Sequence, residues 1–285
     1  MDGFLVIDKE KEYTSRDVVN IISKKFNTNR VGHMGTLDPN ATGVLVIAIG
    51  KALKLIDLLS HEKKEYIATV KLGIKTDTLD ITGKIIEKEK YRDLDSDVIN
   101  SVLHSFVGKS MQEVPLYSAL KVNGKRLYEY ARENKKVKLP VREIEVFEIE
   151  LLSINKDEFM FRTVVSKGTY IRSLIRDIGI KLGQNAAMKD LRRTKQGSFK
   201  IDNSVTLDDI EKNNYRIVSM YDALKDYKFV SVDSFIEGKI LNGRILENRY
   251  DDSIIVFCNS NKEILAVYEV YQKDKTKIKP IKVLK

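Results

Sequence analysis

The sequence contains little cysteine, little histidine and no long apolar run, and each shortage excludes a class of protein. Its single cysteine, Cys258, cannot form a disulfide within the chain, which is compatible with a reducing compartment. No stretch approaches the ~18 apolar residues of a membrane span, and the opening MDGFLVIDKE lacks the basic and long apolar regions of a secretory signal. We therefore expect a cytoplasmic protein.

The sequence contains no motif typical of a metal site or a nucleotide site. The three histidines, His33, His61 and His104, are too far apart in the sequence for a compact zinc site, and the cysteine lies well beyond them. The segment FVGKS at 106–110 is similar to a phosphate-binding loop, but that motif requires a glycine where Leu103 stands. We predict no metal and no nucleotide cofactor.

Length and charge set the remaining bounds. A chain of 285 residues with 42% hydrophobic residues fits one large domain, or a large domain with a small partner. Lys and Arg number 50 against 41 Asp and Glu, a net charge of +9. This excess favours a polyanionic partner, although a soluble protein with a lysine-rich surface gives the same count.

Strand and helix patterns alternate irregularly along most of the chain. Apolar runs and alternation predict strands at 4–8, 44–49 and 66–73, around VFEIELLSI and around FMFRTVVS. Helical spacing and caps predict helices at 15–26, 52–59, 94–108 and 206–212, and another after Gly168. Asn123-Gly124 between apolar residues predicts a hairpin.

The pattern changes near Phe229. Short strands and turns are expected in FVSV, GKILNGRI, SIIVFC and EILAVYEV. This predicts a small all-β domain at about 228–285, or a β extension of the first domain.

The stretch RVGHMGTLDPNATGVLVIAIG, residues 30–50, places Asp38 in a glycine-rich loop that leads into a buried strand. Glycines permit turns and close backbone approaches, and Pro39 stiffens the loop, so one carboxylate can be aimed rigidly. In an arbitrary LDP tripeptide, an Asx-turn role for the aspartate is the alternative. Gly32 to Gly35 also matches the GXXG of a KH loop, but that loop joins two helices and this one enters a strand.

Five blocks, in order, resemble the tRNA pseudouridine synthase B family, whose enzymes convert a T-loop uridine of tRNA to pseudouridine. They are GHMGTLDPNATGVL, EYIATVKLGIKTDTLDITG, QEVPLYSALKVNGKRLYEYAR, SKGTYIRSLIRDIG and MKDLRRTKQGSF. The likeness covers residues 1 to about 200. Glu10 and Glu12 stand where the family has proline and glycine, which puts the shape of that loop in doubt, and Val114 replaces a usual proline.

The resemblance implies a set of catalytic residues. Asp38 is the carboxylate that acts as nucleophile or base, and Arg172 pairs with it. Tyr66 lies beneath the target base and Tyr170 lines the same pocket. The alternatives are a solvated surface arginine at 172 and core aromatics at 66 and 170. No cofactor is required, because the reaction only moves a bond within uridine.

The resemblance also implies how the substrate is held. The target base must be flipped out of the T loop, with His33 inserted among the bases and Leu191 packed against the flipped base. An ordinary core leucine of a helix is the alternative for Leu191. Eight basic residues against two glutamates between Ala119 and Arg142 form a thumb-like insertion that closes over the T arm. The phosphate contacts expected there are Lys121, Lys125, Arg126, Lys135, Lys136 and Lys138.

We therefore expect an α/β (α+β) protein with a mixed, largely antiparallel sheet flanked by helices. Residues 1–227 would form the catalytic domain, with the insertion at about 119–142, and residues 228–285 a small PUA-like RNA-binding domain. The expected partner is tRNA, with no membrane, no small-molecule cofactor and a monomeric chain. The competing hypotheses are an RNA-binding or RNA-folding protein, for which a carboxylate aimed at RNA has no use, and a uridine C5 methyltransferase, which would need a nucleophilic cysteine.

Overall fold

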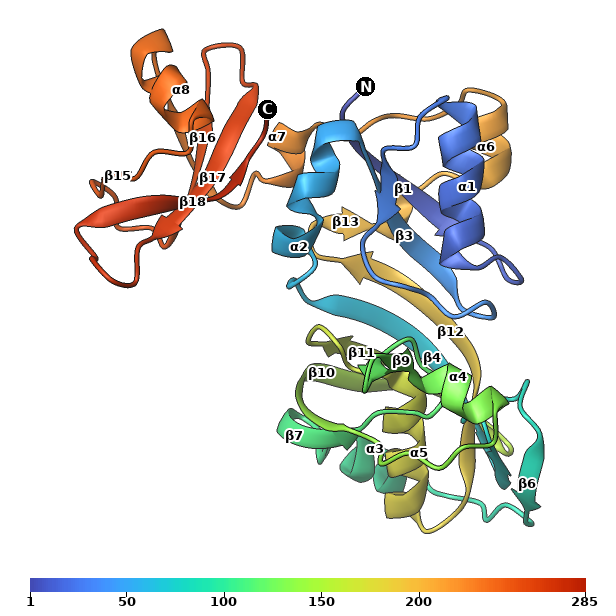
Figure 1. The fold of residues 1–285 in the computed structure, drawn as a ribbon. Helices are drawn as coiled ribbons and strands as arrows, with labels where there is room; N and C mark the ends of the chain where they lie inside the picture. Colours follow the sequence, from blue (N-terminus) through green and yellow to red (C-terminus); the bar gives the residue numbers. More distant parts are fainter.

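A nine-stranded sheet forms the centre of the computed structural model, which describes residues 1–285 (Figure 1). Every neighbouring pair is antiparallel except β3 with β12. The predicted mixed, largely antiparallel sheet is confirmed. Its order is β1 (Gly3–Lys9), β3 (Thr42–Ile49), β12 (Ala186–Gln196), β4 (Lys64–Leu72), β11 (Glu158–Val165), β10 (Val141–Asn155) and β7 (Gly108–Glu113), with β2 (Val31–His33) beside β3 and β13 (Phe199–Lys200) beside β12.

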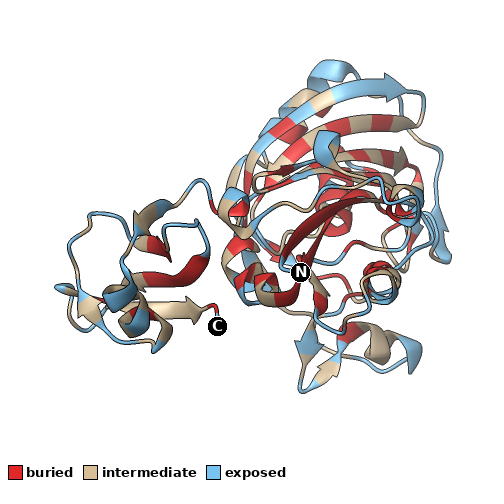
Figure 2. Cartoon of the chain, turned by 90° about the horizontal axis from the view of Figure 1, so that it is seen from above, coloured by how far each residue is buried: buried red, intermediate tan, exposed pale blue.

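The burial of each strand follows its sequence pattern. β4 alternates buried and half-buried residues along its whole length, so one face meets the core and the other is partly open. β3 is buried on both faces, as its continuous apolar run predicts. Figure 2 shows this contrast between the buried central strands and the exposed outer edge of the sheet.

Helices cover the sheet and close the main core. They are α1 (Ser15–Lys25), α3 (Ser96–His104), α5 (Ile171–Leu182) and α6 (Leu207–Glu211). The chain also forms the short helical segments η1 (Gly50–Leu55), α2 (Ile56–Leu59), η2 (Ile201–Asn203) and α7 (Met220–Ala223). Thr14 caps α1 in a reciprocal capping box with Asp17. The helix expected at 52–59 is 3-10 as far as Leu55 and α-helical from Ile56, and the helix expected to reach Gly108 ends at His104. No helix is both long enough and apolar enough to cross a membrane.

Two small hairpins project from this body. β5 (Ile74–Thr76) pairs with β6 (Ile85–Lys88), and β8 (Lys121–Val122) pairs with β9 (Lys125–Arg126). The second hairpin turns at Asn123-Gly124, as predicted, with both residues at positive φ. It leads directly into α4 (Leu127–Arg132).

The C-terminal residues form a separate five-stranded sheet, which lies to one side of the main body (Figure 1). Its order is β14 (Lys228–Ser231), β16 (Ile254–Cys258), β17 (Ile264–Val270), β18 (Lys277–Val283) and β15 (Leu246–Glu247). The prediction that this region is all-β is wrong in one element. Helix α8 (Ser234–Leu241), capped by Asp233, occupies part of the segment expected to be a strand and turn.

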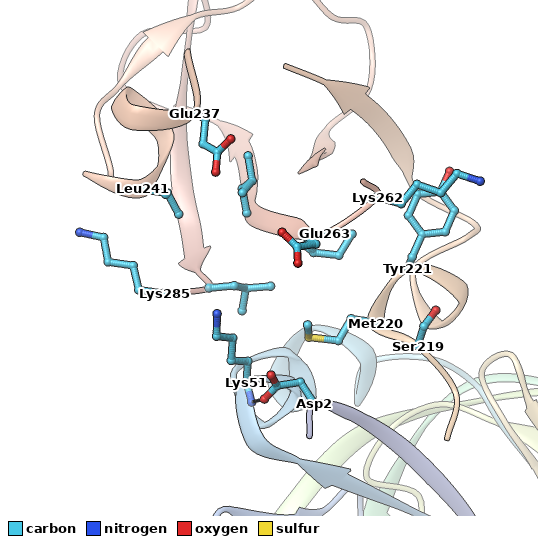
Figure 3. A pocket seen from close by; sticks show the side chains of 13 residues that line it. Asp2, Lys51, Ser219, Met220, Tyr221, Glu237, Leu241, Lys262, Glu263 and Lys285 are labelled. Atoms are coloured by element: carbon cyan, nitrogen blue, oxygen red, sulfur yellow. Dashed lines mark hydrogen bonds between the residues drawn. The ribbon is translucent and has the colours of Figure 1, made fainter. Parts of the chain in front are cut away.

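The two sheets share an apolar junction. Alternate residues of β3 face different cores: Leu45, Ile47 and Ile49 face the main core, whereas the residues between them face a second one. The second core also takes in Val256 of β16 and Leu284, which follows β18. A cavity of about 450 Å³ lies in the junction, with Asp2 and Lys51 on one side and Glu237, Leu241 and Lys285 on the other (Figure 3).

Candidate active site

Asp38 lies in the connection between β2 and β3. The preceding residue, Leu37, is buried, and its backbone N–H donates to the hydroxyl of Ser15 at 2.9 Å. The amide of Ala41 donates to the backbone carbonyl of Asp38 at 3.0 Å. These bonds hold the loop on both sides of Asp38, whose side chain is 38% exposed. The carboxylate is therefore fixed in direction and open to a ligand.

Arg172 is the partner of that carboxylate. Its Nε lies 2.9 Å from Asp38 Oδ2, and Nη2 donates to Oδ1 at 3.3 Å. The predicted pairing is thus present in the geometry. The alternative of a solvated surface arginine is wrong, because only 5% of Arg172 is exposed. A buried guanidinium presents its donors in a fixed plane, so the pair holds the carboxylate in one orientation.

The same guanidinium joins three segments of the chain. Nη1 donates to the carbonyl of Thr78 at 2.8 Å, and Nη2 donates to the carbonyl of Tyr117 at 2.9 Å. Asp80 Oδ2 lies 3.8 Å from Nη1, and its Oδ1 accepts hydrogen bonds from Thr78 and Thr82. Sequence reasoning assigned no role to Asp80 or Tyr117, although the DTLDITG segment was a signal for the former.

The first turn of α5 is anchored against β7, and this anchoring places Arg172. Tyr170, at the N-cap of α5, exchanges two hydrogen bonds with the amide of Gln112: its N–H donates to Oε1 at 2.8 Å and its carbonyl accepts from Nε2 at 3.2 Å. Ser173 donates to the carbonyl of Glu113 at 2.9 Å. The Tyr170 ring packs near the Arg142 guanidinium, 5.3 Å from centroid to Cζ.

Tyr66 and Leu191 lie on two paired strands of the main sheet. Tyr66 is on β4, where it pairs with Thr163 on one side and Arg193 on the other, and is 6% exposed. Leu191 pairs with Ala68 of the same strand. The alternative that made Leu191 part of a helix is wrong, because residues 186–196 form β12. Both side chains belong to the apolar cluster that also contains Leu37 and Ile171, the neighbours of Asp38 and Arg172.

His33 ends β2, five residues before Asp38 in the sequence. Its Nδ1 is buried without a hydrogen-bond partner. Burial lowers the pKa of His33 below its ordinary value, so the imidazole is neutral at pH 7. A neutral, half-buried ring can pack against bases without repelling basic neighbours.

Lys9 is a buried cation that sequence reasoning missed. Its Nζ donates to the carbonyls of Glu10, Tyr13 and Pro39, at 2.8, 2.8 and 3.1 Å. Burial lowers the pKa of Lys9 to about 8, whereas the charge of Asp38 acts in the opposite direction. Lys9 therefore ties the far side of the Asp38 loop to the end of β1.

The basic segment forms the β8–β9 hairpin, helix α4 and the chain that follows. It begins just after Tyr117, whose carbonyl accepts from Arg172. Lys121 and Arg126 are exposed on the hairpin, and Lys125 pairs with Glu133. Lys135 pairs with the same glutamate at 3.0 Å, whereas Lys136 and Lys138 are exposed and make no ion pair. The structure thus separates cations that are neutralised within the segment from cations that are free.

Cys258 is not placed for the methyltransferase alternative. It lies on β16 of the C-terminal sheet, is 4% exposed, and burial raises the pKa of its thiol. A buried, protonated thiol is a poor nucleophile. No group of three or more His, Cys, Asp or Glu side chains is arranged to hold a metal ion.

Comparison with known proteins gives the same family across the chain. Residues 23–171 match the model of the TruB family pseudouridylate synthase N-terminal domain, and residues 172–227 match that of the tRNA pseudouridylate synthase B C-terminal domain. The tRNA pseudouridine synthase B of Oceanobacillus iheyensis is 42% identical, covering 99% of this chain and 97% of its own. That of Clostridium tetani is 40% identical, with both chains covered completely at 100%.

Solved structures agree. A chain in the structure of an H/ACA RNP bound to a substrate RNA containing 2'-deoxyuridine is 26% identical, with a TM-score of 0.74 over 99% of this chain and 85% of that one. A chain of a Cbf5-Nop10-Gar1 complex is 28% identical, with a TM-score of 0.74 over 99% of this chain and 84% of that one. The chain therefore belongs to the TruB family of pseudouridylate synthases and is an isomerase.

Proposed function

We propose that this enzyme isomerises a flipped-out uridine in the T loop of tRNA to pseudouridine and that Asp38 is its catalytic carboxylate. The observation that carries the proposal is the pairing of Asp38 with the buried Arg172, at 2.9 Å, in a loop otherwise anchored by its backbone. A protein that only bound RNA would gain nothing from a carboxylate held toward a polyanion. The family assignment makes uridine the expected base.

The reaction rearranges bonds within one nucleotide. The glycosidic bond between the ribose C1′ and N1 breaks, the base turns, and C1′ bonds to C5. The proton on C5 is then lost while N1 gains one, so no atom is added overall. Asp38 supplies the carboxylate that acts as nucleophile or base, and Arg172 holds that carboxylate in position. This chemistry requires no group beyond the chain and its substrate.

The flipped base is accommodated by the side chains around Asp38. Tyr66 offers an aromatic face beneath it, while Leu191 and Tyr170 contribute further packing. Stacking on an aromatic residue contributes about 1–3 kcal/mol per base, which offsets the few kcal/mol needed to unstack a base from the T loop. His33, neutral because it is buried, is suited to occupy the space among the displaced bases.

The basic segment and the C-terminal domain bind the tRNA backbone. Lys121, Lys125, Arg126, Lys135, Lys136 and Lys138 lie in the segment that starts beside Arg172, which supports contact with the T arm next to the reacting base. Residues 1–227 form the catalytic domain in this proposal, and residues 228–285 bind RNA. The enzyme acts as a monomer in the cytoplasm.

The test is incubation with unmodified tRNA, followed by mapping of pseudouridine in the T loop. The wild-type enzyme is expected to modify one T-loop uridine. Asp38→Asn, which keeps the shape of the side chain and removes its charge, is expected to abolish turnover while tRNA binding survives or tightens. Modification outside the T loop would refute the proposed target, and ordinary turnover by Asp38→Asn would refute the assignment of the carboxylate.

A further inference from the structure

Arg193 is a buried cation with no carboxylate partner. It is 1% exposed, and no Asp or Glu oxygen lies within 4.0 Å of its guanidinium, unlike Arg172 or its own neighbour Arg192. Burying an unpaired charge is costly, and replacing buried ionic groups by well-packed apolar side chains is often neutral or stabilising. Stability of the core is therefore a poor reason for an arginine at this position.

The hydrogen bonds of Arg193 point to another reason. Its Nε donates to the carbonyl of Val44 at 2.6 Å, and its Nη2 donates to the carbonyl of Gly35 at 3.2 Å. Gly35 precedes Asp38 by three residues and Val44 follows it by six, so one planar guanidinium ties both ends of the Asp38 loop together. Two donors in a rigid fork fix the distance between these carbonyls in a way that a single ammonium cannot.

The backbone around Arg193 reinforces this position. Arg193 pairs with Gly43 across the parallel β3–β12 contact, and a Cβ on Gly43 would lie 2.2 Å from the Arg193 carbonyl oxygen. On its other side Arg193 is paired directly with Tyr66. Arg193 therefore lies between β4, which carries the proposed base-stacking tyrosine, and β3, which follows Asp38 in the chain.

The positive charge of Arg193 also reaches the groups around the loop. It contributes to the lowering of the pKa of Lys9, Lys64 and His33, after the larger effect of burial. Arg193 is thus close enough to act on groups that lie around the loop.

We propose that Arg193 is a positioning residue for the isomerisation: it bonds both ends of the loop of residues 35–44 and so sets the place of Asp38. This inference rests on the proposed catalytic function of Asp38. Because the side chain is buried, it acts through the loop and does not contact RNA. Loss of its bonds to the loop is expected to slow the chemical step and to leave tRNA affinity unchanged.

The experiment compares Arg193→Lys, Arg193→Gln and the control Arg162→Lys with the wild-type enzyme and Asp38→Asn. Arg162 lies on β11, where it binds Glu65, Glu148 and Glu150, so the same substitution there removes a guanidinium that is not bonded to the loop. The measurements are the single-turnover rate of pseudouridine formation, the Kd for tRNA, and hydrogen exchange at the amides of Met34 and Ala41, which flank Asp38 and are bonded to Val46 and Asp38.

Both Arg193 variants are expected to lose about 10²-fold in single-turnover rate, the usual consequence of moving a catalytic group by about 1 Å. Their Kd should stay at the wild-type value, and exchange should accelerate at the loop amides alone, whereas Arg162→Lys should match the wild type in all three. Wild-type rates in a folded Arg193→Lys or Arg193→Gln, or failure of both variants to fold, would overturn the positioning role. Failure of the proposed function would show differently, as activity in Asp38→Asn or as a wild-type enzyme without T-loop product.

Discussion

Removal of Arg172 is the sharpest perturbation of the site, because one side chain holds Asp38, the 77–83 loop and Tyr117. Arg172→Ala removes the contacts to Asp38 at 2.9 and 3.3 Å and the hydrogen bonds to the carbonyls of Thr78 and Tyr117. Deleting one partner of a buried ion pair costs about 3–5 kcal/mol. Since Asp38 is 38% exposed and regains water, we expect the lower end, about 3 kcal/mol of unfolding free energy.

The effects on rate and on binding should separate. A carboxylate released from its partner no longer points at the reacting atoms. Misplacement of a catalytic group by about 1 Å can cost about 10²-fold in rate. Arg172 is only 5% exposed, so it cannot contribute a phosphate contact, and the Kd for tRNA should remain that of the wild type. Single-turnover pseudouridine formation, filter binding and urea unfolding measure the three quantities.

Arg176→Ala is the matched control. Arg176 lies one turn further along α5 and pairs with Glu113 and Asp177 at 3.1 and 2.8 Å, with its side chain 23% exposed. Such a surface pair contributes at most about 1 kcal/mol, and its loss should leave the rate intact. If Arg172→Ala weakened tRNA binding in proportion to the rate, Arg172 would be a contact to the RNA and the reasoning from its burial would be refuted.

Three further sets of substitutions test other parts of the structure. Changing both Lys136 and Lys138 to Gln should reduce the slope of log Kd against log salt by about two, roughly one per lost phosphate contact, whereas Lys135→Gln should have less effect because that lysine is already paired; equal effects from all three would contradict this. Tyr66→Leu should slow turnover, because it removes the aromatic face on which the base stacks. Tyr66→Phe keeps that face and should turn over at the wild-type rate, unless the hydroxyl takes the C5 proton. Wild-type rates in both variants would make Tyr66 a core residue only. Glu12→Gly should raise the unfolding free energy by about 0.5–1 kcal/mol in urea titrations, because Glu12 has a φ of 71° that glycine adopts without strain; an unchanged or lower value would show that the side chain compensates for the strain.

Glu12, which stands where the family has a glycine, adopts a left-handed backbone conformation. Its φ is 71°, and its amide donates to the carbonyl of Pro39 at 2.9 Å. A glutamate in this conformation has an energetic cost. A tertiary contact to the Asp38 loop overrides the local preference of the residue.

Helix α8 is the clearest failure of local pattern reading. Short strands and turns are expected in GKILNGRI, but its first four residues end a helix, in which Ile236 and Ile240 have helical spacing. Asp233, which caps the helix by accepting from the amide of Ile236, was the signal that could have located it. A glycine within a short helix is tolerated when its apolar face packs on a sheet.

Local pattern was sufficient for most strands, for the Asn123-Gly124 hairpin and for the loop that carries Asp38, because period, caps and turn residues act between near neighbours in the chain. Family resemblance added the partnership of Asp38 with Arg172, which no local spacing could supply across 134 residues. Only the tertiary structure decided that Arg172 is buried and also binds two backbone carbonyls, and that Lys9 and Arg193 hold the loop without carboxylate partners. The physical reason is that the acceptors are peptide carbonyls, which every residue carries: a sequence does not mark which of them a buried cation will meet, and only the packing of distant strands brings them within reach.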